Sequence, residues 1–174
     1  LKLKKCGEPV PLVQELLDYL KGKPDIFIEL EMKTGNTNVY TEAVLERYCG
    51  LLHDAAKAAL PAGAYSFTSF DMRALRVMRR LYPDASVTLI VGGALDEKQI
   101  KAALELGAKR ISPVMDLTSR KAVKEAKKAG LEVTGWPTRS AEDYALGVAL
   151  GFDCLTTDIP VKLHEAASGG EVGR

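Results

Sequence analysis

The sequence predicts an alternating α/β fold in which helices cover a parallel sheet, and three observations support this prediction. Short apolar runs alternate with amphipathic stretches from residue 25 to residue 160. The last four runs begin about 22 residues apart, which leaves room for a strand, a loop and a helix in each repeat. No Gly-x-Gly-x-x-Gly turn follows any run, which argues against a doubly wound dinucleotide-binding sheet. The uniform spacing instead favours a barrel.

Six segments have the composition of strands, because each is short, rich in Ile, Val, Leu or Phe, and bounded by Gly, Pro or Asp. The predicted strands are Asp25–Met32, Ala64–Thr68, Ser86–Val91, Lys109–Ser112, Leu131–Gly135 and Asp153–Thr156. A closed barrel of parallel strands and helices needs eight strands. Six strands would therefore leave two edges with unpaired backbone, and we expect another segment to cover them.

Amphipathic patterns predict a helix after each of the first five strands. These helices are Thr41–Leu60, Asp71–Leu81, Asp96–Leu106, Thr118–Ala129 and Ser140–Leu150. Each begins with a side chain that can accept from a free backbone N–H group. Three glycines just past helix ends, Gly107, Gly130 and Gly151, suit the left-handed residue that ends a helix. A further helix is predicted at Pro9–Lys21, with no strand before it.

Composition excludes several functional classes. The chain has 174 residues and carries 24 basic and 23 acidic side chains, without the concentrated basic face of a nucleic-acid binder. No apolar stretch approaches the length of a membrane span. Cys6, Cys49 and Cys154 lack the spacing of metal ligands or of a disulfide framework, and the contexts of Cys49 and Cys154 predict small core residues. We expect one domain over residues 1–174, with a flexible tail at 168–174.

The first predicted strand carries an unusual set of charges. Side chains alternate along a strand, so Glu29, Glu31 and Lys33 share one face. In a barrel these charges would point inward and rise toward the C-terminal mouth, where such barrels place their chemistry. Charges in an interior are costly unless they are paired or bind a metal. An edge strand with one solvated face is the alternative for this segment taken alone.

An ordered set of motifs along the whole chain resembles the glycerophosphodiester phosphodiesterase family from its third barrel strand onward. The matching segments are Pro9–Leu17, Glu31-Met32-Lys33, Thr68-Ser69-Phe70-Asp71, Gly135-Trp136-Pro137-Thr138 and Gly151–Pro160. Each motif is weak by itself, and the strength lies in their order and spacing. The resemblance implies a TIM-type (β/α)8 barrel of which about six strand–helix units are present here.

The resemblance also implies a reaction and a site. The family hydrolyses glycerophosphodiesters to an alcohol and glycerol 3-phosphate, a reaction of lipid metabolism on a small-molecule substrate. By resemblance, Glu31 is a ligand of a divalent cation, Mg²⁺ or Ca²⁺, and Lys33 stabilises charge on the phosphoryl oxygens. Phe70 and Trp136 would bind the alcohol portion of the substrate, with ordinary core packing as the alternative for both. Glu29 is placed outside the site, paired with Arg110.

The chain departs from the family pattern at the acid–base groups. The family uses two histidines on its first two strands, together with two further metal carboxylates, and none of these matches a residue here. His53 and His164 both fall in predicted helices that face outward. Acid–base assistance is typically worth about 10²–10⁴ in rate. We therefore expect the intact protein to be a phosphoric diester hydrolase and this segment alone to be inactive.

Two other functions stay open from the sequence. The chain could be a non-catalytic truncated barrel that binds a phosphate ligand or, at its open edges, a complementing subunit or a second copy. The second alternative is a barrel enzyme that acts on sugar phosphates. Such enzymes usually have a Gly-rich phosphate loop after the seventh or eighth strand, and its absence argues against this alternative. The corresponding loops here read Trp136–Arg139 and Thr157–Pro160. The cellular location is not assigned, because any signal peptide is expected to lie ahead of residue 1.

Overall fold

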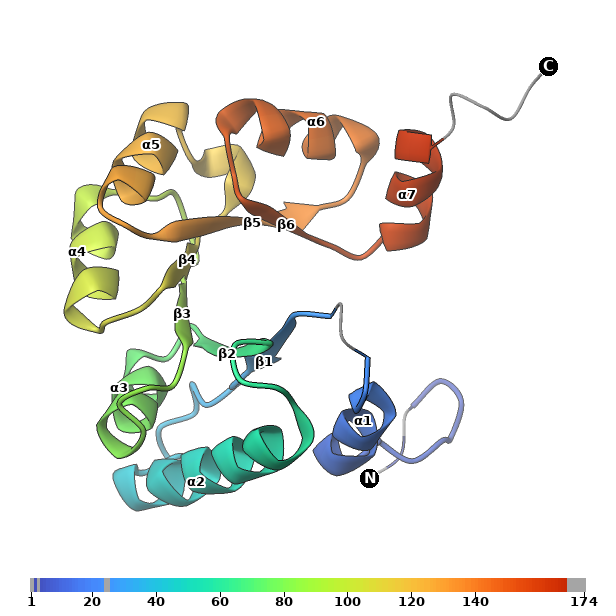
Figure 1. The fold of residues 1–174 in the computed structure, drawn as a ribbon, viewed down its shortest axis with the longest axis vertical. Coiled ribbons are helices and arrows are strands. Elements are labelled where there is room, and N and C mark those ends of the chain that lie inside the picture. The colour runs from blue at the N-terminus through green and yellow to red at the C-terminus, as the bar shows by residue number, and fades with distance from the viewer. Residues whose placement is uncertain (1, 3, 24–25, 169–174) are drawn as a thin grey trace.

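The computed structural model describes residues 2, 4–23 and 26–168, and in these residues a six-stranded parallel sheet curls into part of a barrel. Its strands are β1 (Ile28–Glu31), β2 (Tyr65–Ser69), β3 (Val87–Ile90), β4 (Arg110–Ser112), β5 (Glu132–Thr138) and β6 (Cys154–Thr157). Neighbours in the sheet follow one another in sequence, and all five pairs are parallel. The structure thus confirms a partial TIM-type barrel, seen as an open arc with its helices on the outside (Figure 1).

The helices are connected to the strands as the alternating pattern predicted. They are α1 (Val13–Leu20), α2 (Glu42–Ala59), α3 (Met72–Leu81), α4 (Glu97–Glu105), the 3-10 turn η1 (Met115–Leu117), α5 (Arg120–Lys128), α6 (Ala141–Leu150) and α7 (Pro160–Ser168). No helix in the described ranges is long and apolar enough to span a bilayer.

The hydrophobic core lies between the convex face of the sheet and the helices. Alternate strand residues such as Phe67, Val87 and Ile111 are fully buried there against helical side chains such as Leu75 and Met78. The other set of strand residues points to the concave face, where it is largely polar. Ser66 and Thr88, for example, share a hydrogen bond of 2.9 Å on that face. The separation of apolar and polar side chains onto the two faces therefore fixes the register, since a one-residue slip would exchange the two sets.

The ends of the helices agree with the sequence except at two caps. Asp71, Asp96 and Ser140 each accept a hydrogen bond from a first-turn N–H, as predicted. Thr41 occupies the N-cap of α2 without a side-chain bond. The cap of α5 is Ser119 rather than Thr118, because the η1 turn takes up Thr118 through a bond to the Val114 carbonyl.

The three glycines predicted to end helices all adopt the left-handed conformation, with φ of +69° at Gly107 and +89° at Gly130 and Gly151. The prediction for Cys154 was wrong, since its side chain is exposed on β6, whereas Cys49 is fully buried as expected. Cys154 belongs to the strand set that points to the concave face, which the arc leaves open. Apart from Ser168, the predicted tail lies outside the described residues.

The two edges of the arc are β1 and β6, and no pairing joins them. Close to the first edge, α1 exposes an apolar stripe of Leu12, Leu16 and Tyr19, whose exposed fractions are 69%, 48% and 70%. Their i, i+4, i+7 spacing places them on one side of the helix. The structure therefore keeps the open edges and uncovered apolar surface that a six-stranded arc predicts.

Candidate active site

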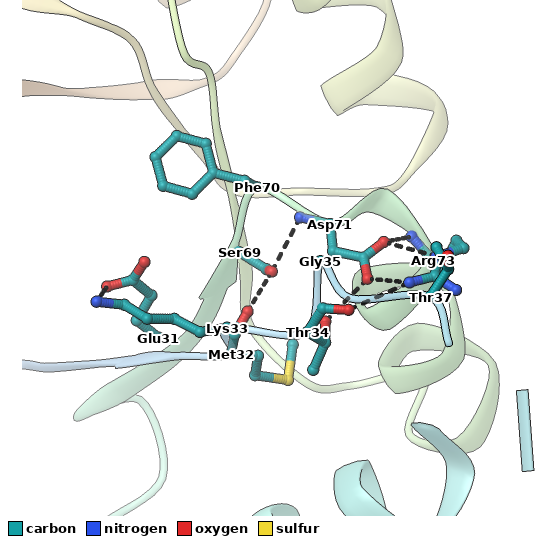
Figure 2. Close-up of a pocket in the computed structure, with 10 residues that line it drawn as sticks. All are labelled: Glu31, Met32, Lys33, Thr34, Gly35, Thr37, Ser69, Phe70, Asp71 and Arg73. Atoms are coloured by element: carbon teal, nitrogen blue, oxygen red, sulfur yellow. Dashed lines mark hydrogen bonds and ion pairs between the residues drawn. The ribbon is translucent and has the colours of Figure 1, made fainter. Parts of the chain in front are cut away.

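A cavity of about 600 Å³ lies at the edge where the carboxyl ends of β1 and β2 meet (Figure 2). Because the strands are parallel, the residues that follow them are brought together at the same mouth. The cavity is lined by Glu31, Met32, Lys33, Thr34, Gly35, Thr37, Ser69, Phe70, Asp71 and Arg73. Three of the four site residues expected from the sequence are in this set, and they come from two strands.

Glu31 and Lys33 form an ion pair at this mouth, with Nζ of Lys33 lying 3.4 Å from a carboxylate oxygen of Glu31. The Lys33 side chain is 80% exposed and the Glu31 side chain 35% exposed. An exposed pair of this kind contributes little to stability. Its ammonium can therefore leave the carboxylate for an anionic ligand at small cost.

Phe70 and Trp136 lie against each other although β2 and β5 are three strands apart in the sheet order. Their ring centroids are 5.6 Å apart and the rings are perpendicular. The indole N–H of Trp136 donates to the Ser112 carbonyl at 2.9 Å, which fixes its ring, while Phe70 is 51% exposed. The two rings form an aromatic wall beside the cavity that Glu31 and Lys33 line, on the same edge of the sheet.

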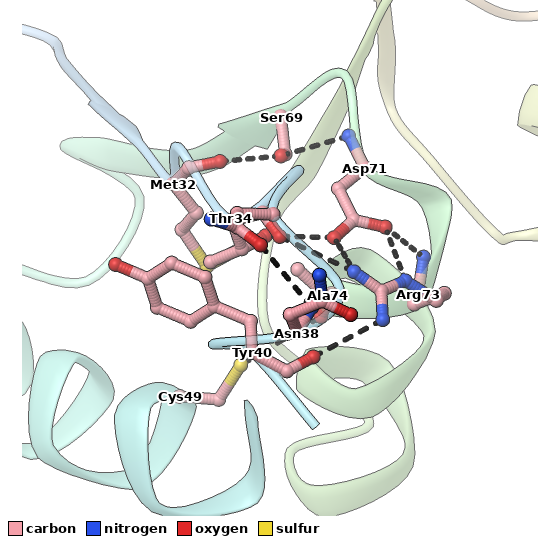
Figure 3. A network of polar contacts seen from close by, with 10 residues as sticks. Met32, Thr34, Asn38, Tyr40, Cys49, Ser69, Asp71, Arg73 and Ala74 are labelled. Atoms are coloured by element: carbon pink, nitrogen blue, oxygen red, sulfur yellow. Dashed lines mark hydrogen bonds and ion pairs between the residues drawn. The ribbon is translucent and has the colours of Figure 1, made fainter. Parts of the chain in front are cut away.

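A polar network that sequence reasoning missed supports the floor of the cavity (Figure 3). Asp71 accepts from the hydroxyl of Thr34 at 2.9 Å and from the guanidinium of Arg73 at 2.8 Å. Burial raises the pKa of Asp71, but the hydrogen bonds from Arg73 and Thr34 outweigh it and hold that pKa below its usual value. The helix-capping role of Asp71 could be read from the sequence. Its contact with Thr34, which lies 37 positions away in sequence, left no local signal.

Deeper in the arc, the expected pairing of Glu29 with Arg110 was wrong. Arg110 donates to Glu132, the residue directly opposite it on the neighbouring strand β5, and its guanidinium lies 3.9 Å from the centre of the Phe27 ring. The cross-strand neighbour is closer to Arg110 than Glu29, which is three strands away. The pKa of Glu29 is raised, mainly because the side chain is partly buried and in smaller part because Glu31 is negatively charged. The positive charge of Arg110 opposes this rise without cancelling it.

The metal-ligating side chains near the cavity do not by themselves form a site for a divalent cation. Hard cations such as Mg²⁺ and Ca²⁺ take several oxygen ligands. Within the described residues there is no group of three or more His, Cys, Asp or Glu side chains that could hold a metal ion. Glu31 supplies one carboxylate to the mouth, and Asp71 is already engaged by Thr34 and Arg73.

Neither histidine lies in the cavity. His53 is on α2, where its ring stacks on Tyr82 with a centroid distance of 3.5 Å, and its side chain is 13% exposed. His164 is exposed on α7. His53 therefore packs between helices and His164 faces outward, as their predicted helical positions suggested.

The model of the glycerophosphoryl diester phosphodiesterase family matches residues 1–162. This chain belongs to that family. A search of curated protein sequences found no significant match. The ordered motifs had predicted this family, and the match confirms the family.

Solved structures of similar proteins agree in fold. A Silicibacter pomeroyi protein assigned to the glycerophosphoryl diester phosphodiesterases has a TM-score of 0.81 and 23% identity, with 94% of this chain and 58% of that chain covered. A glycerophosphodiester phosphodiesterase from Parabacteroides distasonis has a TM-score of 0.73 and 21% identity, covering 97% and 68%. An Oleispira antarctica phosphodiesterase, solved with the product sn-glycerol-3-phosphate, has a TM-score of 0.70 and 19% identity, covering 82% and 55%. This chain thus spans less than two thirds of the Silicibacter pomeroyi and Oleispira antarctica structures.

Proposed function

We propose that this chain supplies the later strands of a phosphodiesterase barrel, and that the intact barrel hydrolyses a glycerophosphodiester to an alcohol and glycerol 3-phosphate. The observation that carries the proposal is the meeting of Glu31, Lys33 and Phe70 in one cavity at the carboxyl ends of β1 and β2. Membership of the family, and an Oleispira antarctica phosphodiesterase bound to sn-glycerol-3-phosphate, support the same substrate class.

Each residue has a role that follows from its position. The exposed ammonium of Lys33 binds the phosphoryl oxygens. It stabilises the charge that builds on them while the oxygen of water, or of a substrate hydroxyl followed by water, bonds to phosphorus and the P–O bond to the alcohol breaks, and the proton released by the attacking oxygen ends on the alcohol. Phe70 and Trp136 form an apolar wall that suits the alcohol portion of the substrate and limits the access of water. Glu31 is one candidate ligand of a divalent cation, Mg²⁺ or Ca²⁺, and the described residues hold no group of three or more His, Cys, Asp or Glu side chains that would complete such a site.

A non-catalytic module is the second candidate. The cavity lining holds two carboxylates, of which Asp71 is engaged by Thr34 and Arg73, and it holds no histidine; both facts favour this candidate for the 174-residue chain taken alone. Such a module would bind a phosphate-bearing ligand through Lys33, or a complementing segment through its open edges. The two functions differ in turnover, while both predict phosphate binding at Lys33.

The first test is binding of sn-glycerol 3-phosphate by the 174-residue chain, measured by calorimetry. We expect Lys33→Met to weaken binding about tenfold, the value of one charge-assisted hydrogen bond. Lys98→Met, which removes an exposed lysine from α4, should leave the affinity unchanged. Equal affinity of the wild type and Lys33→Met for sn-glycerol 3-phosphate would refute the proposed phosphate-binding role of Lys33.

The second test is hydrolysis of glycerophosphocholine or glycerophosphoethanolamine with Mg²⁺, with Ca²⁺ and with a chelator. We expect no turnover by the isolated chain under any of these conditions, because no histidine lines the described cavity and its two carboxylates are paired with Lys33 or with Thr34 and Arg73. Metal-dependent turnover that is lost in Glu31→Ala would refute the inactivity of the isolated chain and leave the enzymatic proposal in place.

A further inference from the structure

Lys33 is an exposed residue between two buried ones. Met32 and Thr34 are 1% and 0% exposed, whereas the Lys33 side chain is 80% exposed. Lys33 follows the end of β1 at Glu31, so the β-ladder no longer holds its side chain in place. Whatever fixes the backbone at Met32 and Thr34 therefore decides where the Lys33 ammonium can reach.

Hydrogen bonds from the turn between β2 and α3 provide this restraint on both sides of Lys33. The Ser69 hydroxyl donates to the Met32 carbonyl at 2.5 Å and accepts from the Asp71 N–H at 3.0 Å. Arg73 donates to the Thr34 carbonyl at 3.2 Å, and Asp71 accepts from the Thr34 hydroxyl. Figure 3 shows these contacts between the two loops.

Arg73 also extends the restraint to the start of α2. Its second terminal nitrogen donates to the Tyr40 carbonyl at 3.1 Å, while Nε donates to Asp71 at 3.1 Å. Each of its three guanidinium nitrogens thus has a partner within the protein. This arrangement argues against Arg73 as a phosphate ligand, although it lines the cavity, and favours a structural bridge across the loop from Lys33 to Tyr40.

We propose that Asp71 and Arg73 are positioning residues for Lys33. This inference rests on the proposed function, in which Lys33 contacts the phosphoryl group. The Asp71–Arg73 pair sets the backbone on the C-terminal side of Lys33, and Ser69 sets it on the other side. Phe70 lies between Ser69 and Asp71, so the same turn places the aromatic wall and the ammonium relative to each other. Loss of the pair would leave the cavity residues present but less precisely placed, which is costly for a site.

Two variants isolate the restraint from the fold. Thr34→Val keeps the shape of the side chain and removes the hydroxyl that donates to Asp71. Arg73→Lys keeps the positive charge, but one ammonium cannot bond Asp71 and both carbonyls as the planar guanidinium does. Asp96→Ala is the matched control, because it removes a helix cap of the same type from α4, away from this network.

The experiment has a readout that needs no ligand. The amides of Met32, Val39 and Tyr40 are hydrogen-bonded to Thr68 and Asn36 carbonyls, so their hydrogen exchange reports the order of the β1–α2 loop. We expect both variants to speed this exchange about tenfold and Asp96→Ala to leave it unchanged. Unchanged exchange in Thr34→Val and Arg73→Lys would overturn the proposal.

The second readout is affinity for sn-glycerol 3-phosphate, measured well below the unfolding temperature of each variant. A positioning role predicts a loss of about tenfold in Arg73→Lys, approaching that of Lys33→Met, and no loss in Asp96→Ala. Faster exchange with unchanged affinity would reduce the pair to a structural role and overturn the proposal. If the wild type does not bind this probe, the proposed function fails, and the exchange measurement alone decides whether the pair orders the loop.

Discussion

At the scale of single residues, Asp71 joins local structure to the candidate site. It caps α3 through the N–H of Arg73 and also binds the Thr34 hydroxyl across the cavity floor. A carboxylate whose pKa is lower in the folded chain than in the unfolded chain stabilises the fold above its unfolded pKa. This stability is lost as the pH falls through the folded pKa, and Asp71 belongs to this class.

We therefore predict that Asp71→Asn destabilises the chain by about 1–3 kcal/mol at pH 7, because it weakens a largely buried charge-assisted network. The difference from wild type should shrink as the pH falls through the folded pKa of Asp71, which lies below its usual value, because the wild-type carboxylate then becomes protonated. Urea unfolding over a series of pH values from neutral into the acid range measures it. Asp116→Asn, which alters an exposed aspartate outside the network, is the control. A deficit that stays constant across the whole series would contradict the assigned role.

The sequence predicted the exposed part of the site better than its support. Glu31 and Lys33 could be placed together because strand alternation is local, whereas Phe70 was assigned by the family resemblance, and the structure brings it to the same cavity. Thr34–Asp71 and Arg110–Glu132 are long-range contacts whose partners depend on register between strands and loops. Periodicity does not encode that register, so Glu29 was paired with the wrong partner and the restraint on Lys33 was missed.

At the scale of elements, two helical glycines have opposite surroundings. A Cβ at Gly50 in α2 would meet only the Tyr82 hydroxyl, at 3.5 Å, which is ordinary contact. A Cβ at Gly147 in α6 would lie 2.5 Å from a Leu155 methyl and 2.8 Å from the Met115 sulfur. Gly147 thus lets α6 approach β6 closely.

From these surroundings we predict opposite effects of one substitution. Gly50→Ala should stabilise the chain by about 0.5–1 kcal/mol, because alanine loses less backbone entropy in a helix. Gly147→Ala makes the same gain but forces Leu155 and Met115 to move, at a cost of about 1–3 kcal/mol, so we expect net destabilisation. Chemical denaturation of the two variants beside wild type measures both signs. Equal stabilisation by the two would show that α6 is free to move away from β6.

The elements were predicted more completely than their ends. All six strands and their parallel order follow from apolar runs separated by capped helices. The ends differ by a few residues where tertiary contacts intervene. β5, for example, extends to Thr138 because it pairs with β6 beyond Gly135 through an irregular register. The shift of the α5 cap from Thr118 to Ser119 has a local origin, since Thr118 ends η1 and its hydroxyl donates to the Val114 carbonyl.

At the scale of the whole molecule, the open arc leaves strand edges and apolar side chains that another segment or another chain could cover. Among the residues that the structure describes, β1 and β6 each pair with one neighbouring strand only, and α1 with its N-cap presents Leu12, Leu16 and Tyr19 to solvent. Unpaired parallel edges beside apolar surface favour association with other chains. In a longer protein the same surface would pack against further barrel units, whereas the 174-residue chain by itself can satisfy it only through another molecule.

We predict that the isolated chain self-associates, and that the apolar stripe on α1 contributes to this association. Sedimentation velocity over a range of concentrations should show species larger than the monomer. Leu12→Glu with Tyr19→Glu should shift the distribution toward monomer, because charge on the stripe opposes its burial. Leu51→Glu changes a side chain that is equally exposed, at 65%, but lies on α2, and should leave the distribution unchanged. A wild-type chain that stays monomeric at every concentration would contradict the prediction and show that the arc tolerates its open edges. A shift in Leu51→Glu as large as in the α1 variant would show that general surface charge, rather than the stripe, controls association.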